Sequence, residues 1–164
     1  MTELQVGALG TSLLFDVFAL NQAVGGMLTA AMRDGPLTPA EYAVYSAVFE
    51  LEAATPTQLA ARLGMRLTTF MDQLRLLEGR GHARRTEHPT DGRSYRVVLT
   101  AAGLEAHRGA NRLFERANAA FVANLPAGEA AAKSALLGVR TAAESVLASV
   151  AAGASPRRLA GRAG

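Results

Sequence analysis

The sequence predicts a mainly α-helical protein with one small β-hairpin. Of its 164 residues, 49% are hydrophobic but only 5% are aromatic, and tryptophan is absent. An alanine-rich composition with so few aromatic residues favours helices over sheets. Two Thr-Pro capping boxes mark helix starts, and one Asp-Gly pair between two short segments marks a hairpin. The length suffices for one domain with its own core, or for two small intertwined ones.

The composition excludes several classes of site. The chain contains no cysteine, which excludes disulfides, cysteine-ligated zinc, iron–sulfur clusters and thiol switches. His82, His88 and His107 belong to different elements and lack a carboxylate cluster, so no metal site is expected. No nucleophile–base arrangement appears, and "GALGTS" (7–12) lacks the lysine of a phosphate-binding loop. We therefore expect no enzyme and no cofactor.

The apolar N-terminal segment does not have the features of a targeting sequence. Residues 4–20 are apolar, but no cationic region precedes them, and Glu3 and Asp16 interrupt the pattern. We therefore expect a cytoplasmic protein that does not enter a membrane.

The net charge of +3 is unevenly distributed. Residues 1–61 carry one arginine and six acids, whereas residues 62–96 carry eight arginines and four acids. Residues 97–164 carry eight cations and four acids. The basic central segment is either a nucleic-acid footprint or a solvated arginine-rich surface, and charge alone favours neither.

Helical spacing and capping signals predict the first three helices. A helix over 3–32 has a wide apolar surface, which is either ordinary core or a face for a second chain; "RDGP" (33–36) ends it. The capping box "TPAE" (38–41) starts a second helix, and "TPTQ" (55–58) starts a short third helix that ends at Gly64.

A fourth helix, over 65–81, has two distinct sides. Four apolar residues spaced by three and four define a predicted buried stripe: Leu67, Phe70, Leu74 and Leu77. Polar residues lie mainly off this stripe: Arg66, Thr68, Thr69, Asp72, Gln73 and Arg75. With Ala60 and Gly64 before it, this helix completes a helix-turn-helix pattern.

A hairpin follows directly. Residues 82–87 and 93–99 flank the turn sequence "HPTDG", and Tyr95, Val97 and Leu99 alternate with more polar residues. A hairpin after a helix-turn-helix defines a winged helix. Thr100 is the predicted cap of the next helix, which Leu125-Pro126 ends, and a last helix covers about 127–151.

At this point the order of elements resembles the MarR family of bacterial winged-helix transcriptional regulators. The resemblance covers about residues 5–150 and rests on "LTPAEYAVYSAV", "TPTQLAARLGM", "TTFMDQLRLLEGRGHARR" and "HPTDGRSYRVVLTAAG". It implies a winged helix-turn-helix lobe with terminal dimerisation helices. The expected division is an N-terminal dimerisation helix (1–36), a DNA-binding lobe (37–100), C-terminal dimerisation helices (101–152) and a disordered basic tail (153–164).

The resemblance also implies a homodimer that presents two winged helices to double-stranded DNA. A small-molecule pocket is expected where the dimerisation helices meet the lobe, and an occupant would change the spacing of the two recognition helices. Phe18, Tyr42 and Tyr45 are candidates to line a pocket for a phenolic or aromatic-acid effector. Core residues are the alternative interpretation of these three aromatics.

The helix over 66–75 is the expected recognition helix. Glutamine suits adenine, arginine suits guanine, and aspartate accepts from cytosine or orients an arginine. Many relatives carry Thr or Ser and then Arg where this chain has Met71 and Asp72, which puts the sequence it reads in question. Asp72 is alternatively an intrahelical partner of Arg75.

The hairpin is expected to support affinity rather than base choice. Arg93 corresponds to the family's wing arginine and is a minor-groove candidate, and Asp91 holds the turn or pairs with an arginine. Arg84, Arg85, Arg96 and His88 are candidates for contacts with the DNA backbone. Together these features predict a homodimeric repressor on a pseudo-palindromic operator; the alternative is a ligand-binding helical dimer that does not bind DNA.

Overall fold

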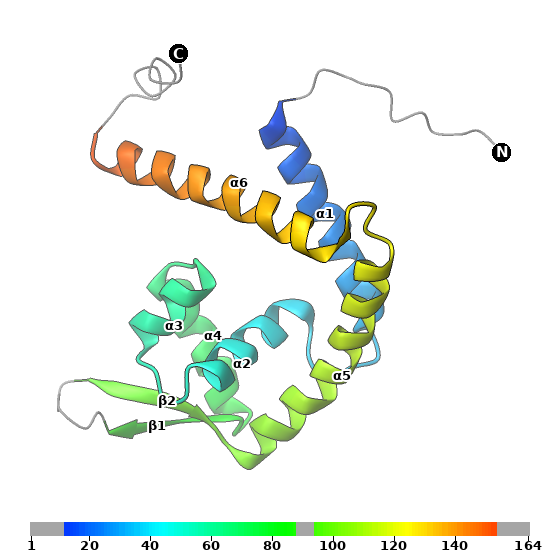
Figure 1. Cartoon of the computed structure of the whole chain (residues 1–164). Coiled ribbons are helices and arrows are strands. Elements are labelled where there is room, and N and C mark those ends of the chain that lie inside the picture. The colour runs from blue at the N-terminus through cyan, green and yellow to red at the C-terminus, as the bar shows by residue number, and fades with distance from the viewer. Residues whose placement is uncertain (1–11, 88–93, 154–164) are drawn as a thin grey trace. The chain divides into compact units, whose positions relative to one another are not determined.

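The computed structural model describes residues 12–87 and 94–153. Within these residues it has six helices and one antiparallel hairpin (Figure 1), as the sequence predicts. The elements are, in order, α1 (Leu13–Ala31), α2 (Pro39–Glu50), α3 (Pro56–Leu63), α4 (Leu67–Gly79), β1 (Ala83–Glu87), β2 (Tyr95–Leu99), α5 (Ala101–Ala123) and α6 (Gly128–Ala151).

The chain divides into two compact units, residues 1–117 and 118–164. The boundary falls within α5, so the first unit holds the four N-terminal helices, the hairpin and the first part of α5. The sequence-based division, at residues 37 and 101, separates segments by their expected roles and not by their compactness. It stays a prediction. The predicted disordered tail lies outside the described residues from 154 onward.

Both predicted capping boxes form, and each has proline in the first turn of its helix. The Thr38 hydroxyl accepts from the Glu41 N–H at 3.3 Å, while a Glu41 carboxylate oxygen accepts from the Thr38 N–H at 2.8 Å. Thr55 and Gln58 make the same pair of bonds at 3.3 and 2.9 Å. Local sequence alone therefore fixes where α2 and α3 begin.

The turn between α3 and α4 depends on a glycine. Gly64 ends α3 with φ of 64°, a left-handed conformation in which a side chain is strained. Three residues of the predicted stripe on α4, Phe70, Leu74 and Leu77, are at most 1% exposed. Leu67 was predicted to join them but is 44% exposed. It is the first residue of α4, one turn before Phe70, and so lies at the end of the buried stripe.

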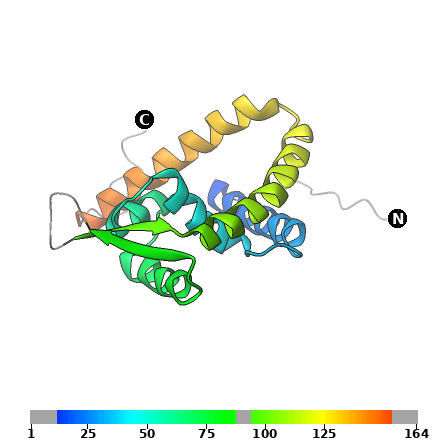
Figure 2. The ribbon, with the colours of Figure 1, turned by 90° about the horizontal axis from the view of Figure 1, so that it is seen from below.

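The two strands form an antiparallel hairpin (Figures 1 and 2). Its register matches Ala83 with Leu99 and Glu87 with Tyr95. Val97, in the middle of β2, is fully buried, and its N–H donates to the Ala54 carbonyl at 2.9 Å. Tyr95 and Leu99 pack against the same core. The predicted alternation of β2 is therefore confirmed, and Ala54 extends the hairpin by a single bridge.

The start of α5 is tied to the end of α4. Thr100 caps α5 as predicted, because its hydroxyl accepts from the Gly103 N–H at 3.2 Å. The same hydroxyl donates to the Gly81 carbonyl at 2.7 Å, and the Thr100 N–H donates to the His82 carbonyl at 3.0 Å. A Cβ atom at Gly103 would lie 2.0 Å from the His82 carbonyl oxygen. Glycine is required here because the two backbones approach so closely.

The core of the first unit is formed by residues from Met32 to Ala110 and includes Tyr45, Leu59, Phe70 and Val97. α1 and α6, in contrast, contain no buried residue. α1 is long and apolar enough to cross a membrane, with a mean hydropathy of 1.4 over its most apolar window. Core helices of soluble proteins and signal sequences meet the same criterion, so this property by itself does not make α1 a membrane span.

Candidate nucleic-acid interface

α4 presents a polar side to solvent because its opposite side is held in the core. Phe70, Leu74 and Leu77 fix the helix from within. Five of the six residues predicted to read bases are exposed, and Gln73 is half-buried: Arg66, Thr68, Thr69, Asp72, Gln73 and Arg75. The structure thus brings the predicted set together on one helix, while their contact with DNA stays a prediction.

Two features determine the charge of α4: its N-terminal end and an ion pair on its surface. Arg66 is the N-cap residue and makes no side-chain capping bond, and no acidic residue lies in the first turn. This helix end therefore keeps its positive dipole end, which attracts phosphate. Arg75 forms an ion pair with Asp72. The interpretation of Asp72 as an intrahelical partner of Arg75 is therefore confirmed.

Met71, which departs from the family pattern, has a packing role. Its side chain is half-buried against the core, and the Tyr95 hydroxyl donates to the Met71 Sδ at 3.7 Å. The residue thus joins α4 to β2. Spacing within α4 gave no sign of this contact, because Tyr95 is 24 residues away.

Two arginines of the hairpin share a face away from the core. Arg84 is paired with Val98, and Arg96 is paired with Thr86, so alternation places both arginines on the same side of the sheet. Arg84 is exposed and Arg96 is half-exposed. His88, Asp91 and Arg93, also predicted for this region, lie outside the described residues.

Arg85 holds the hairpin against α4. Its Nε and Nη2 donate to the two carboxylate oxygens of Glu78 at 2.7 and 3.0 Å. Its guanidinium carbon lies 4.5 Å from the centre of the Tyr95 ring. The bond to Glu78 raises the pKa of Arg85 above its ordinary value. A backbone-contact role for Arg85 stays a prediction, but these contacts already engage its donors on the protein, a function that sequence spacing did not reveal.

The structure also groups residues that the sequence did not connect. Arg62 of α3 is paired with Glu50 of α2, with Nη2 and Oε2 2.8 Å apart. A groove of about 550 Å³ lies beside this pair and is lined by both Arg62 and Arg96. Glu52 lines the same groove, so its charge is mixed.

The three aromatic residues predicted to line a ligand pocket lie in different surroundings. Phe18 is 60% exposed on α1. Tyr45 is fully buried, and its hydroxyl lies 2.8 Å from the His82 Nδ1, as expected for a core residue. Tyr42 donates to the Asn111 Oδ1 at 2.6 Å and lines a cavity of about 260 Å³ with Phe114.

A buried histidine adjoins Tyr42. The His107 ring stacks on Tyr42 and Phe49, with ring centres 5.5 and 4.8 Å apart, and lies 3.1 Å from the Ser46 hydroxyl. Burial lowers the pKa of His107 and raises that of Tyr42. The spacing of residues 42, 46 and 49 places them on one side of α2, which the sequence could predict. Their partner on α5, His107, is distant in sequence and could not be predicted in this way.

A second groove, of about 420 Å³, lies between the segment 34–36 and α5. Arg112 and Arg116, one turn apart, both line it, together with Leu113 and the acidic residues Asp34 and Glu105. The described ranges 12–87 and 94–153 contain no group of three His, Asp or Glu side chains that could hold a metal ion.

No family model matches the sequence, and no curated protein matches it. Solved structures do. The transcriptional repressor CouR, bound to a 23-mer DNA duplex, is 26% identical, with a TM-score of 0.70 over 87% of this chain and 99% of CouR. The M. tuberculosis transcriptional regulator MosR, in complex with DNA, is 23% identical, with a TM-score of 0.72 over 83% and 98%.

The apo form of E. coli MarR is 24% identical to this chain and has a TM-score of 0.64, over 78% of this chain and 96% of MarR. Each of these proteins is matched over almost its entire length. The chain therefore has the fold of the MarR-family winged-helix transcriptional regulators.

Proposed function

We propose that this chain is a regulator that binds double-stranded DNA, with α4 in the major groove. The observation that carries the proposal is the two-sided character of α4. A stripe that is at most 1% exposed holds the helix rigidly, and the polar residues on its other side are free to contact bases. CouR and MosR, which share the fold, were crystallised with DNA.

The apolar surfaces of α1 and α6 support a homodimer. Leu14 and Phe18 of α1 are 76% and 60% exposed, and Leu147 of α6 is 69% exposed. Two helices with this much apolar surface and no buried residue need a partner, and a second copy of the chain offers the same surfaces. A twofold dimer would bind a pseudo-palindromic operator with half-sites roughly 34–36 Å apart.

Within this proposal the recognition helix and the hairpin have different roles. Gln73 and Arg75 are the candidates to select bases, Thr68 and Thr69 contact phosphate or a thymine methyl, and Asp72 orients Arg75. Arg84 and Arg96 contact the DNA backbone, as does Arg66 at the start of α4. The minor-groove role of Arg93, with Asp91 and His88 beside it, rests on the sequence.

We further infer that an aromatic acid regulates the protein, which acts as a cytoplasmic repressor. Arg112 and Arg116, one turn apart in the groove beside α5, are the candidates to bind the carboxylate, and Asp34 and Glu105 line the same groove. The cavity beside Tyr42 and Phe114 is a separate candidate site, where an aromatic ring would meet two aromatic side chains. Tyr45 is not among these candidates, because its ring is fully buried and its hydroxyl is bonded to His82.

Selection of bound duplexes from a random pool tests the function directly. The purified dimer should enrich a pseudo-palindrome, and a gel shift should then show specific binding. Gln73→Ala should change the enriched sequence, whereas Arg84→Ala should weaken binding to all duplexes by a similar factor. Arg108→Ala, which removes one exposed charge from α5, is the control.

A folded dimer that binds no duplex at low salt would contradict the proposal. If the same protein bound an aromatic acid selectively, the alternative of a ligand-binding module without DNA binding would replace it. Met71 and Asp72, which depart from the family pattern, are the residues that support this alternative. Met71 packs against Tyr95, and Asp72 pairs with Arg75, so both have roles that are compatible with DNA binding.

A further inference from the structure

α2 and α3 begin with the same capping geometry but differ in one chemical group. The Thr38 N–H and hydroxyl donate to Glu41 Oε2 at 2.8 and 3.0 Å. The Thr55 N–H and hydroxyl donate to Gln58 Oε1 at 2.9 and 3.1 Å. A neutral amide therefore caps a helix in this chain as completely as a carboxylate does. The charge of Glu41 is not needed for the cap.

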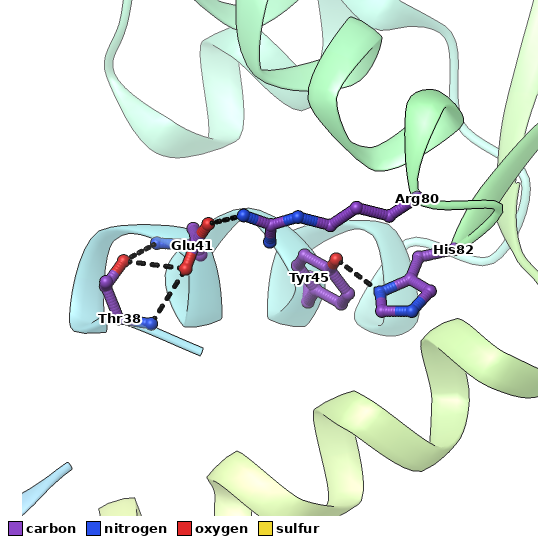
Figure 3. A network of polar contacts seen from close by, with 5 residues as sticks. All are labelled: Thr38, Glu41, Tyr45, Arg80 and His82. Carbon is purple, nitrogen blue, oxygen red and sulfur yellow. Dashed lines mark hydrogen bonds and ion pairs between the residues drawn. The ribbon is translucent and has the colours of Figure 1, made fainter. Parts of the chain in front are cut away.

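The second oxygen of Glu41 shows what the charge does. Glu41 Oε1 accepts from Arg80 Nη2 at 2.7 Å (Figure 3). The Glu41 side chain is 17% exposed, so solvent screens this pair less than an ordinary surface ion pair. Burial raises the pKa of Glu41, but the bonds from Thr38 and Arg80 outweigh burial and hold that pKa below its ordinary value. The carboxylate is thus stabilised in its charged form.

Arg80 lies at a junction in the proposed DNA-binding lobe. It is the C-cap residue of α4, and its N–H donates to the Leu76 carbonyl at 3.1 Å. Two residues later, the His82 Nδ1 lies 2.8 Å from the Tyr45 hydroxyl (Figure 3). Glu41 and Tyr45 are one turn apart on α2. Two side-chain contacts from α2 therefore hold the segment that joins α4 to the hairpin.

We propose that Glu41 is a positioning residue for DNA binding: its charge holds Arg80 and thereby fixes the angle of α4 and the hairpin relative to α2. The inference rests on the proposed function. It differs from a direct role of Arg80 on DNA, because removal of the Glu41 charge would then leave Arg80 freer to meet phosphate. In that case the affinity for DNA would be unchanged or higher.

Glu41→Gln separates the two accounts. Glutamine retains the capping bonds, as Gln58 demonstrates, and removes the charge that faces Arg80. The selected duplex should bind this variant roughly 2- to 30-fold more weakly, the range expected for residues that act on a site without touching the ligand. Glu105→Gln is the matched control, because it removes a carboxylate from another arginine pair that is not attached to α4.

Arg80→Gln should lose a similar factor, and the double variant Glu41→Gln/Arg80→Gln should lose no more than either single variant, because the two residues act as one unit. Hydrogen exchange of the amides of residues 77–82, measured without DNA, should be faster in Glu41→Gln and unchanged in Glu105→Gln. Arg80→Lys should bind DNA more tightly than Arg80→Gln but more weakly than the native protein, because lysine keeps the positive charge and loses the planar guanidinium group.

Three results would overturn the inference: unchanged or tighter DNA binding by Glu41→Gln, additive losses in the double variant, or unchanged exchange at residues 77–82. If the native protein binds no DNA, the proposed function fails instead. The exchange measurement then still decides whether Glu41 positions the end of α4.

Discussion

The region from Met32 to Ala110 and the helices α1 and α6 differ in how their apolar residues are used. In the first region, Tyr45 of α2, Phe70 of α4 and Val97 of β2 are all fully buried. In α1 and α6 no residue is buried, although both helices carry several leucines and valines and α1 also carries two phenylalanines. The first region buries its apolar side chains in its own core, whereas α1 and α6 leave theirs exposed.

This difference shows what each region needs in order to be stable. An isolated helix in water has little stability unless its apolar face is covered. The helices of the first region are covered by one another, whereas α1 and α6 need a further partner. We therefore expect substitutions in the lobe to act on folding, and substitutions in α6 to act on association.

The largest effect should come from the centre of the lobe. Phe70→Ala removes a fully buried ring and should lower the free energy of unfolding by about 3–5 kcal/mol. Leu67→Ala, on the same helix but 44% exposed, should cost much less. Urea denaturation of both variants measures the difference, and equal losses would contradict the described packing of α4.

Association should respond most to α6. Leu147→Asp places a charge on a leucine that is 69% exposed, and it should weaken the proposed dimer by about 2–4 kcal/mol if a partner covers this residue. Ser145→Asp adds the same charge on the opposite side of the helix and is the control. Sedimentation velocity should show monomers only for Leu147→Asp, with the circular dichroism of the lobe retained. A dimer of unchanged affinity would show that this surface is not the interface.

A smaller effect should separate two glycines. Gly103→Ala places a Cβ atom 2.0 Å from the His82 carbonyl oxygen and should destabilise the lobe by about 1–3 kcal/mol. Gly138→Ala in α6 meets no atom within 4 Å and should stabilise its helix by about 0.5–1 kcal/mol. Thermal melts should therefore shift in opposite directions. Shifts in the same direction would mean that the approach of α5 to residue 82 is not as close as described.

The smallest effect should be a pH dependence at His107. Burial lowers the pKa of His107 in the folded chain below its ordinary value of 6.5, because the ring is enclosed by Tyr42, Phe49 and Ser46; Glu50 opposes this shift and Arg108 adds to it. The unfolded chain then binds more protons, so stability is complete above about pH 6.5 and falls as the pH drops below that value. His107→Gln should flatten this part of the stability curve. If stability fell equally with pH in the native protein and in His107→Gln, the pH dependence would come from other groups.

Local signals predicted most of the lobe. The boxes at Thr38 and Thr55, the glycine at 64 and the alternation of Tyr95, Val97 and Leu99 each act within a few residues, so spacing reveals them. Leu67 was wrongly placed in the core because helical spacing does not show where the covering elements end. The contacts of Met71, Arg85 and His107 were not predicted, since their partners belong to other elements. The faces that α1 and α6 would present to a second chain also cannot be predicted from neighbouring residues.

The slope of DNA affinity against salt tests the central claim most directly. Each phosphate that an arginine neutralises releases counterions, so the logarithm of the binding constant should fall linearly with the logarithm of salt concentration. Fluorescence anisotropy with the selected duplex should give this line for the native protein, and Arg96→Ala should reduce its slope by about 1. A binding constant that does not depend on salt, or no binding by the folded dimer, would contradict the assignment of α4 and the hairpin as a DNA-binding surface.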